Sequence, residues 1–339
     1  MRIGVMTAGG DCPGMNAAIR GVVTRATADG ATVLGFENGW DGVMEGKYRP
    51  LGRDDVRGIL VRGGTILGTS RIDPYFHGDG YASIRDTVDR VGVDRLVVIG
   101  GDGTLRTAVR LHDDGLGVIG VPKTIDNDIG GTDVSFGFNT AVQIVTDAID
   151  RLTTTAEAHN RVMVVEVMGR TTGWIATYAG MAGGAEAILV PESEYDIEDL
   201  ADRLRRRHAS GHTYSIVVVA EGVPAPGGGS RTSGVDVFGF ARLGGVGESI
   251  AAGLETLTGF EARTMALGHL QRGGTPTAFD RILATRLGVG AAEMALVGRS
   301  GIMMALSGDE IVAVDLRQAC SEVRGLDVSR YREAAWFFA

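Results

Sequence analysis

The chain has 339 residues, enough for about two domains of ~150 residues each, and its formal net charge is −9 at pH 7. This charge argues against general binding to nucleic acid or to acidic membranes, and no apolar run reaches the ~18 residues that a membrane-spanning helix needs. The two cysteines, Cys12 and Cys320, imply no disulfide framework, and the first residues lead into a strand rather than a signal peptide, so we expect a cytoplasmic protein.

The first half of the chain alternates short apolar strands with helices. The run from Leu96 to Ile99 is apolar without alternation, which is typical of a parallel strand covered on both faces. Strands are expected at 3–7, 32–36 and 96–99 and from Gly117 onward, helices at 15–26, 83–91 and 104–111, and a glycine-rich loop carrying two arginines at 62–71. Glycine turns between strands and helices make anion sites, because free N–H groups and the helix dipole point at the turn.

The second half continues this alternation. Strands are expected at 161–168, 187–190, 214–220, 264–267, 302–306 and 311–314, and helices at 139–154, 173–181, 197–208 and 248–257. The segment 224–245 is rich in glycine, proline and serine, which predicts a loop or flexible insertion. The pattern as a whole predicts an α/β fold. We expect two lobes of doubly wound, largely parallel sheets with helices on both faces, and an active site in the cleft between them.

Carboxylates occupy two of the expected strand-end turns. Asp102 lies in the turn GGDGT, and Asp126 and Asp128 lie in TIDND at the end of the next strand. Carboxylates repel phosphate unless a divalent cation lies between them or one of them takes a proton from an attacking hydroxyl. A phosphate cradle combined with acids therefore favours phosphoryl transfer. The alternative is that these carboxylates only cap helices.

Arginines gather at expected strand ends in the second half, although the chain as a whole is acidic. Each could be an ordinary surface ion pair, but together they favour an anionic substrate, since guanidinium groups match phosphate oxygens. The set comprises Arg161, Arg170, Arg263 and Arg272, with His269 and Glu221 beside them.

The sequence resembles the phosphofructokinase family. The matching stretches are GGDCPGMNAAIRGVV, RGGTILGTSR, GGDGT, PKTIDNDIGGTDVSFGFNTA, RVMVVEVMGR, AEGV, GHLQRGGTP and FDRILATRLG, in the family's order from residue 9 to about 288. TIDND, MGR and GHLQRGG are specific as a set, whereas GGDGT also occurs in NAD kinases and lipid kinases. A NAD kinase would leave MGR and GHLQRGG without an explanation.

The resemblance implies a role for each matching residue. Asp126 would be the general base on the 1-hydroxyl of the sugar, Thr124 and Asp128 would support the base and the metal, and Arg170 would stabilise the moving phosphoryl group. The donor would be held by Mg²⁺ on Asp102 and by Gly9, Gly10, Arg71, Gly103 and Thr104, with the N–H groups of Gly9 and Gly10 facing the phosphates. Fructose 6-phosphate would contact Thr124, Asp126, Asp128, Met168, Gly169, Arg170, Glu221, His269 and Arg272.

The resemblance also implies a homo-oligomer and two lobes that bind different substrates. Arg161 and Arg263 would reach the 6-phosphate from a neighbouring subunit, so a homo-oligomer, either dimer or tetramer, is expected. Residues 1–138 and about 271–320 would form the donor lobe, and about 139–270 with 321–339 the sugar-phosphate lobe.

The sequence gives conflicting indications of which phosphoryl donor is used. Family members use ATP or pyrophosphate, and Gly103 resembles the ATP users, because an aspartate there would occupy the place of the α-phosphate and repel it. Lys123 resembles the pyrophosphate users, although its long stem can also lie aside. The pair resembles an ATP-using subgroup among the longer actinobacterial-type enzymes. We therefore expect an ATP-dependent 6-phosphofructokinase, with the pyrophosphate-dependent enzyme and a non-catalytic regulatory subunit as alternatives.

Overall fold

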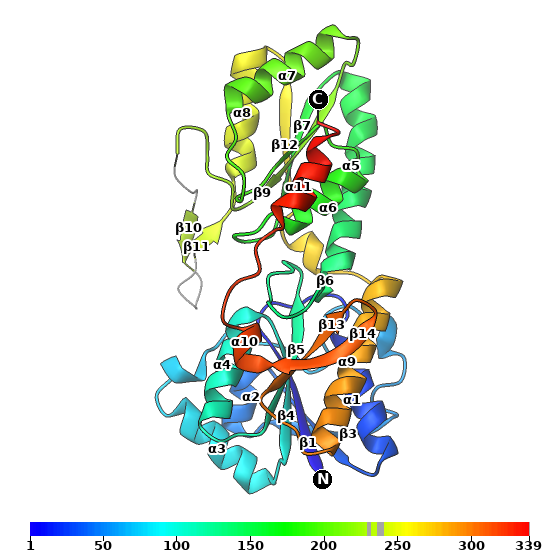
Figure 1. Cartoon of the computed structure of the whole chain (residues 1–339), viewed down its shortest axis with the longest axis vertical. Helices are drawn as coiled ribbons and strands as arrows, with labels where there is room; N and C mark the ends of the chain where they lie inside the picture. Colours follow the sequence, from blue (N-terminus) through cyan, green and yellow to red (C-terminus); the bar gives the residue numbers. More distant parts are fainter. Residues whose placement is uncertain (229–231, 236–240, 339) are drawn as a thin grey trace. The chain divides into compact units, whose positions relative to one another are not determined.

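The computed structural model describes residues 1–228, 232–235 and 241–338 of the chain. The chain divides into two compact units, each assembled from two stretches of sequence. Unit 1 comprises Met1–Thr140 and Arg272–Arg324, and unit 2 comprises Ala141–Gln271 and Gly325–Ala339. Each unit has its own central sheet (Figure 1).

Unit 1 is built on an eight-stranded sheet with the order β14-β13-β5-β4-β1-β2-β3, in which β6 pairs with β5 outside this path. The strands are β1 (Arg2–Ala8), β2 (Thr32–Phe36), β3 (Tyr48–Leu51), β4 (Arg95–Gly100), β5 (Val118–Thr124), β6 (Phe136–Gly137), β13 (Ile302–Ser307) and β14 (Glu310–Asp315). The inner pairs are parallel, and antiparallel pairs occur at the two edges. Val97, Val98 and Ile99 are each 0% exposed, as expected for a central strand covered on both faces.

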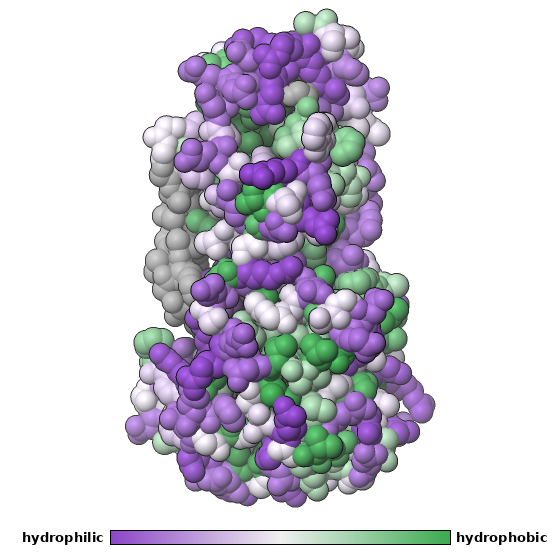
Figure 2. Space-filling view, viewed as in Figure 1, coloured by the Kyte–Doolittle hydropathy of each residue, from purple (hydrophilic) through white to green (hydrophobic). Residues whose placement is uncertain are grey.

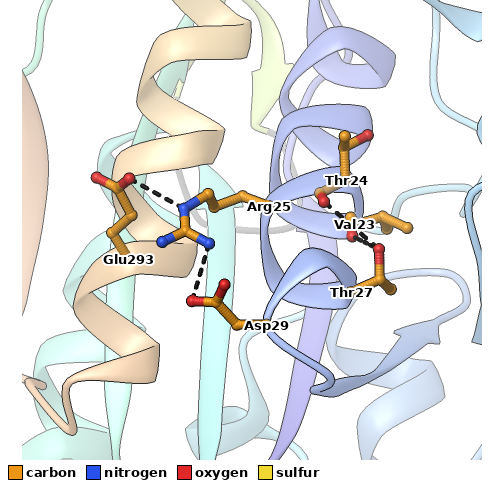
Figure 3. Close-up of polar contacts among 6 residues, drawn as sticks. All are labelled: Val23, Thr24, Arg25, Thr27, Asp29 and Glu293. Atoms are coloured by element: carbon orange, nitrogen blue, oxygen red, sulfur yellow. Dashed lines mark hydrogen bonds and ion pairs between the residues drawn. The ribbon is translucent and has the colours of Figure 1, made fainter.

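Helices cover both faces of the unit 1 sheet (Figure 1). Helices α1 (Met15–Ala28) and α9 (Ala278–Leu296) pack on one face; α2 (Trp40–Glu45), α3 (Gly80–Val91), α4 (Asp102–Asp113) and α10 (Leu316–Ala319) pack on the other, and short 3₁₀ turns lie at η1 (Ile59–Val61) and η2 (Pro74–Phe76). Helices α1 and α9 approach closely, because a Cβ on Gly288 would lie 2.3 Å from the carbonyl oxygen of Ala18. Figure 3 shows the polar end of this contact, where Arg25 binds Glu293 at 3.0 Å and Asp29 at 2.9 Å.

Unit 2 contains a four-stranded, all-parallel sheet with the order β12-β7-β9-β8. Its strands are β7 (Val162–Val167), β8 (Ala187–Leu189), β9 (Ser215–Ala220) and β12 (Ala262–Ala266). Its helices are α5 (Phe138–His159, which begins in unit 1), α6 (Trp174–Ala182), α7 (Ile197–Ala209), α8 (Val246–Thr258) and α11 (Val328–Ala335). A 3₁₀ turn, η3 (Gly268–Arg272), follows β12. Helices α7 and α8 lie on one face and α6 and α11 on the other (Figure 1). The predicted fold class, an α/β protein with two largely parallel sheets, is confirmed.

The segment 224–245 differs from the prediction of a loop. Its described residues include β10 (Thr232–Val235) and β11 (Ala241–Leu243), which form a two-stranded antiparallel sheet. A prediction from composition misses these strands, since glycine and proline surround them in the sequence. Strands of three or four residues also give too few positions for an alternating pattern. Residues 229–231 and 236–240, which also fall in the predicted flexible insertion, lie outside the described residues.

The visible surface carries hydrophilic side chains over most of its area, and hydrophobic residues form small separate patches (Figure 2). The hydrophilic character is marked over α7, whose buried residues are confined to Leu200, Ala201 and Leu204. Across the part of the chain that the structure describes, no helix combines the length and the apolar character needed to cross a bilayer.

Candidate active site

In unit 1, the glycine turn after β1 meets the start of α4 and the end of β5. Gly9 has φ of 82°, a left-handed conformation that glycine adopts without strain. A Cβ on Gly9 would lie 3.1 Å from Thr104 Oγ1 and 3.5 Å from Lys123 Nζ. Three of the segments that the sequence analysis assigned to the phosphoryl donor therefore converge within one unit.

The backbone N–H of Gly9 is already used inside the protein. It donates to the carbonyl oxygen of Ser70 at 2.8 Å, and Thr69 Oγ1 donates to the carbonyl oxygen of Gly9 at 2.7 Å. In this structure the 62–71 loop takes up this hydrogen bond, and a donor phosphate would share the N–H with Ser70 or replace it there. The same two bonds fix that loop, which carries Arg71, onto the turn.

Two guanidinium groups approach Gly10, the next residue of the turn. A Cβ there would lie 2.8 Å from Arg272 Nη1 and 3.4 Å from Arg71 Nη2. Arg272 Nη1 also donates to the carbonyl oxygen of Asp11 at 3.2 Å. Two cations beside a side-chain-free turn form an anion-binding arrangement. Arg71 and Arg272, which the sequence analysis placed on different substrates, thus lie beside the same glycine.

Asp102 is the first residue of α4 rather than part of the preceding turn. A Cβ on Gly100 would lie 2.3 Å from Thr104 Cγ2, so the chain needs glycine where β4 ends. Arg106, one helical turn further along α4, donates to the two carboxylate oxygens of Asp102 at 2.8 and 3.0 Å. The carboxylate therefore has a counter-ion within the protein, and a metal ion would share or replace that contact.

The donor set around Asp102 fits a magnesium ion that arrives with a polyphosphate. Mg²⁺ is usually held by one or two carboxylates, with waters and substrate phosphates completing its shell. Among the residues that the structure describes, no group of three or more His, Cys, Asp or Glu side chains could hold a metal ion by itself. Asp102, whose side chain is 12% exposed at the start of α4, matches the first requirement.

Asp126 and Asp128 follow directly after β5 and are buried, at 3% and 6% exposure. The N–H of Asp126 donates to Thr124 Oγ1 at 3.1 Å, and the N–H of Arg324 donates to the carbonyl oxygen of Asp128 at 2.9 Å. Since β4 and β5 are adjacent parallel strands, the segments of Asp102 and Asp126 lie at the same edge of the sheet. The structure thus brings these predicted acids to one place.

Lys123 lies inside unit 1 at 2% exposure, and its ammonium group donates to the carbonyl oxygen of Gly10. Burial, which disfavours the charged form, lowers the pKa of Lys123 from 10.5 to about 8. The side chain is therefore folded against the glycine turn and does not extend into solvent.

Replacing Lys123 with methionine should raise the melting temperature at pH 7. The lowered pKa means that the folded state carries a burial penalty of up to about 3 kcal/mol below pH 8, where the lysine is charged in both the folded and unfolded states. As the pH rises from 8 to 10.5, the folded-state lysine loses its proton and the penalty declines. Thermal unfolding of both proteins between pH 6.5 and 10.5 should show the difference shrinking with pH; a difference independent of pH contradicts this account.

In unit 2, the carboxyl ends of β7, β9 and β12 bring together a second set of predicted residues. Arg170 has φ of 54°, which is uncommon for a residue with a side chain, and its N–H donates to Glu221 Oε1 at 3.0 Å. A Cβ on Gly169 would lie 2.4 Å from the carbonyl oxygen of Thr172, so only glycine fits there. His269 is exposed in η3, which follows β12.

Gln271 connects two of these turns, and the sequence analysis gave it no role. Its side chain is 0% exposed; Oε1 accepts from the N–H of Met168 at 3.2 Å, and Nε2 donates to the carbonyl oxygen of Gly268 at 3.0 Å. The buried amide therefore fixes the GHLQRGG turn against the MGR turn. Its burial and both contacts depend on tertiary structure, so no sequence signal could have indicated them.

Arg161 and Arg263 lie at the opposite, amino edge of the unit 2 sheet. Arg161 immediately precedes β7 and Arg263 is the second residue of β12, whereas Arg170 follows the carboxyl end of β7. A strand of six residues spans roughly 20 Å, so these two arginines cannot join Arg170 at one site within the unit.

Glu261 binds both of these arginines. Its carboxylate pairs with Arg161 Nε at 2.8 Å and with the guanidinium of Arg263, and the hydrogen bond from Arg161 lowers the pKa of Glu261. The spacing of Glu261 and Arg263, two residues apart, could have indicated this pair, because such residues share one face of a strand. The Asp102–Arg106 pair could likewise have been found from its four-residue helical spacing.

Comparisons with known proteins find matches over most or all of the chain. A family model described as phosphofructokinase matches residues 2–295. The chain is 53% identical over 341 residues to a pyrophosphate–fructose 6-phosphate 1-phosphotransferase of Amycolatopsis methanolica, with 100% of both chains covered. It is 51% identical over 337 residues to ATP-dependent 6-phosphofructokinase 3 of Streptomyces coelicolor, covering 98% of this chain and 99% of that one.

The fold also matches a solved structure. A phosphofructokinase of Pichia pastoris, crystallised in the T-state, superposes with a TM-score of 0.84 at 32% identity. The match covers 94% of this chain and 35% of the Pichia pastoris chain, so this chain spans about a third of that protein.

Proposed function

The chain belongs to the phosphofructokinase family, and from this we propose that it is an ATP-dependent 6-phosphofructokinase acting in the cytoplasm. It would transfer the terminal phosphoryl group of ATP to the 1-hydroxyl of fructose 6-phosphate, a step of glycolysis, and release fructose 1,6-bisphosphate and ADP. The observation that carries the proposal is the meeting of an acidic pair of strand ends, β4 and β5, with a glycine turn and two arginines in unit 1.

In the proposed mechanism, Asp126 accepts the proton of the 1-hydroxyl as that oxygen attacks the terminal phosphorus atom. Thr124 and Asp128 support this carboxylate, and Arg170 stabilises the charge on the moving phosphoryl group. Phosphoryl transfer depends mainly on positioning of the reactants and on neutralisation of the phosphoryl charge. Buried carboxylates and arginine guanidinium groups supply these effects.

The donor would be bound by the residues that converge in unit 1. Mg²⁺ held by Asp102 would neutralise donor oxygens, and the guanidinium of Arg71 would add to that neutralisation. The remaining contacts would come from the turns, at Gly9, Gly10, Gly103 and Thr104.

The sugar phosphate would be bound by residues of unit 2 together with Arg272. Met168, Gly169, Glu221 and His269 lie at or after the carboxyl ends of its strands. Arg161 and Arg263, at the opposite end of the same sheet, would serve the 6-phosphate site of a neighbouring subunit. We therefore propose a homo-oligomer with shared sites. The retention of Asp102, Asp126, Asp128 and Arg170 speaks against a non-catalytic regulatory subunit.

Two observations support ATP as the donor. Among the described residues, and apart from the adjoining backbone of α4 itself, no heavy atom lies within 4 Å of a Cβ placed on Gly103, so the helix start is open where a nucleotide would extend beyond its terminal phosphates. Lys123, the residue that resembles pyrophosphate users, has its ammonium group bonded to the carbonyl oxygen of Gly10. The second candidate is the pyrophosphate-dependent enzyme, which the 53% identity to the Amycolatopsis protein favours.

The test is the rate of fructose 1,6-bisphosphate formation with Mg²⁺, measured with ATP and with pyrophosphate as alternative donors. We expect turnover with ATP and little with pyrophosphate. Faster turnover with pyrophosphate, together with the reverse reaction using orthophosphate, would establish the second candidate. Absence of turnover with either donor would refute both.

A further inference from the structure

The loop that carries Asp126 is closed by side chains of the loop itself. This loop, residues 125–135, connects β5 to β6, and Asn127 and Ser135 lie near its two ends. Asn127 Oδ1 accepts from the N–H of Ser135 at 3.0 Å. Ser135 Oγ lies 3.0 Å from the carbonyl oxygen of Thr124 and 3.4 Å from Asn127 Oδ1. Because a hydroxyl has a single proton, we assign it to the shorter bond, with Thr124.

These bonds tie the end of β5 to the start of β6 with Asp126 between them. All three partners are buried: Ser135 is 0%, Asn127 2% and Thr124 8% exposed. Asp126 is fixed from a second direction, since its own N–H donates to Thr124 Oγ1 at 3.1 Å. Hydrogen bonds of this kind are costly to break when the remaining partner stays buried without water.

The residue type at position 127 suits two demands at once. Its φ is 54°, a left-handed conformation that asparagine tolerates better than most residues with a side chain. Glycine would satisfy this conformation but has no oxygen with which to reach Ser135. A glycine substitution can therefore keep the left-handed backbone conformation while it removes the side-chain oxygen.

We propose that Asn127, acting with Ser135, is a positioning residue that fixes the carboxylate of Asp126 for catalysis. This inference rests on the proposed function, in which Asp126 is the general base. A general base must be placed within hydrogen-bond reach of its proton, and misplacement by about 1 Å costs on the order of 10²-fold in rate. Loss of the clamp formed by Asn127 and Ser135 therefore lowers kcat, while substrate contacts made by other residues are kept.

The decisive experiment compares Asn127→Gly, Asn127→Asp and Ser135→Ala in the full chain, with kcat, the KM for fructose 6-phosphate and the melting temperature measured for each. Asn127→Gly should lower kcat by roughly 10- to 100-fold with KM changed by less than about threefold. Asn127→Asp keeps an acceptor oxygen for the N–H of Ser135 and should recover part of that loss. Its added carboxylate beside Asp126 should also move the acid limb of the kcat profile to higher pH.

The control is Asn38→Gly. Asn38 also has a left-handed conformation, with φ of 57°, but it is exposed and lies in another turn of unit 1. This variant should retain wild-type kcat. If Asn127→Gly also retains kcat within twofold, the clamp has no positioning role and the inference is wrong. Should Asn127→Gly fail to fold, Ser135→Ala, which removes only the bond to Thr124, must still lower kcat by about three- to tenfold or the inference fails.

Amide hydrogen exchange distinguishes a failure of this inference from a failure of the proposed function. If the wild-type protein phosphorylates fructose 6-phosphate with neither donor, the assignment of Asp126 falls, and with it the catalytic meaning of the clamp. Exchange in the peptide that contains Ser135 then reports on the clamp alone: protection in the wild type that is lost in Asn127→Gly shows that it holds the loop, and equal protection in both shows that it does not.

Discussion

Replacing Asp126 with asparagine is expected to lower kcat by ~10²–10⁴ with little change in the KM for fructose 6-phosphate. Asparagine has nearly the same shape and keeps the backbone N–H that donates to Thr124 Oγ1, so the loop at the end of β5 should keep its fold. An amide cannot accept the proton of the 1-hydroxyl, however, so the attacking oxygen must lose it to water. The effect should therefore fall on the chemical step, which single-turnover rates separate from binding.

A matched control is available in the same loop. Asp133 is exposed, and its carboxylate accepts the N–H of Gly308 at 2.7 Å. Asp133→Asn makes the same chemical change at a residue that has no proposed part in catalysis, and it should leave kcat close to that of the wild type. Equal turnover of Asp126→Asn and the wild type would remove Asp126 from the mechanism.

The central strands were predictable because burial on both faces leaves a plain signal in the sequence. The run Leu96–Ile99 has no polar position, and the structure places it in the middle of the unit 1 sheet. Edge strands lack that signal. Strand β3 contains Pro50 and, within the described residues, pairs with β2 alone, in an antiparallel edge position where proline is tolerated, so no strand was predicted at 48–51. The strands β10 and β11 were missed because four and three residues give too few positions for an alternating pattern.

The candidate site was predictable as a set of residue types at strand ends but not as a geometry. The sequence analysis grouped Arg161 with Arg170, whereas the structure puts them at opposite ends of β7, because one precedes the strand and the other follows it. Contacts over long sequence separations left no trace in the pattern. The N–H of Gly9 donates to the carbonyl oxygen of Ser70 in a distant loop, and Gln271 ties together two turns that are 103 residues apart.

Replacing Gly103 with aspartate is expected to lower kcat/KM for ATP by roughly 10²–10³, while the protein stays folded. Gly103 is the second residue of α4, outside the left-handed region, and a Cβ placed there would have no heavy atom of the described residues within 4 Å beyond the adjoining backbone of its own helix. An added carboxylate near a helix N-terminus is also favourable for the helix dipole. Its effect falls on the ligand instead: two like charges about 4 Å apart repel by about 4 kcal/mol at an effective dielectric constant of 20, and each 1.4 kcal/mol is a factor of ten.

An asparagine at position 103 separates the effect of the added charge on activity from the effect of the added volume. Gly103→Asn adds nearly the same volume without the charge, so it should keep most of the activity with ATP if repulsion of the α-phosphate is what matters. Pyrophosphate has no further phosphate beyond the pair that both donors share, so the aspartate should change the ratio of ATP to pyrophosphate use rather than both rates alike. Equal losses in the two variants would assign the effect to volume. Unchanged use of ATP by the aspartate variant would place the nucleotide away from the start of α4, and the reason for preferring ATP over pyrophosphate would then be lost.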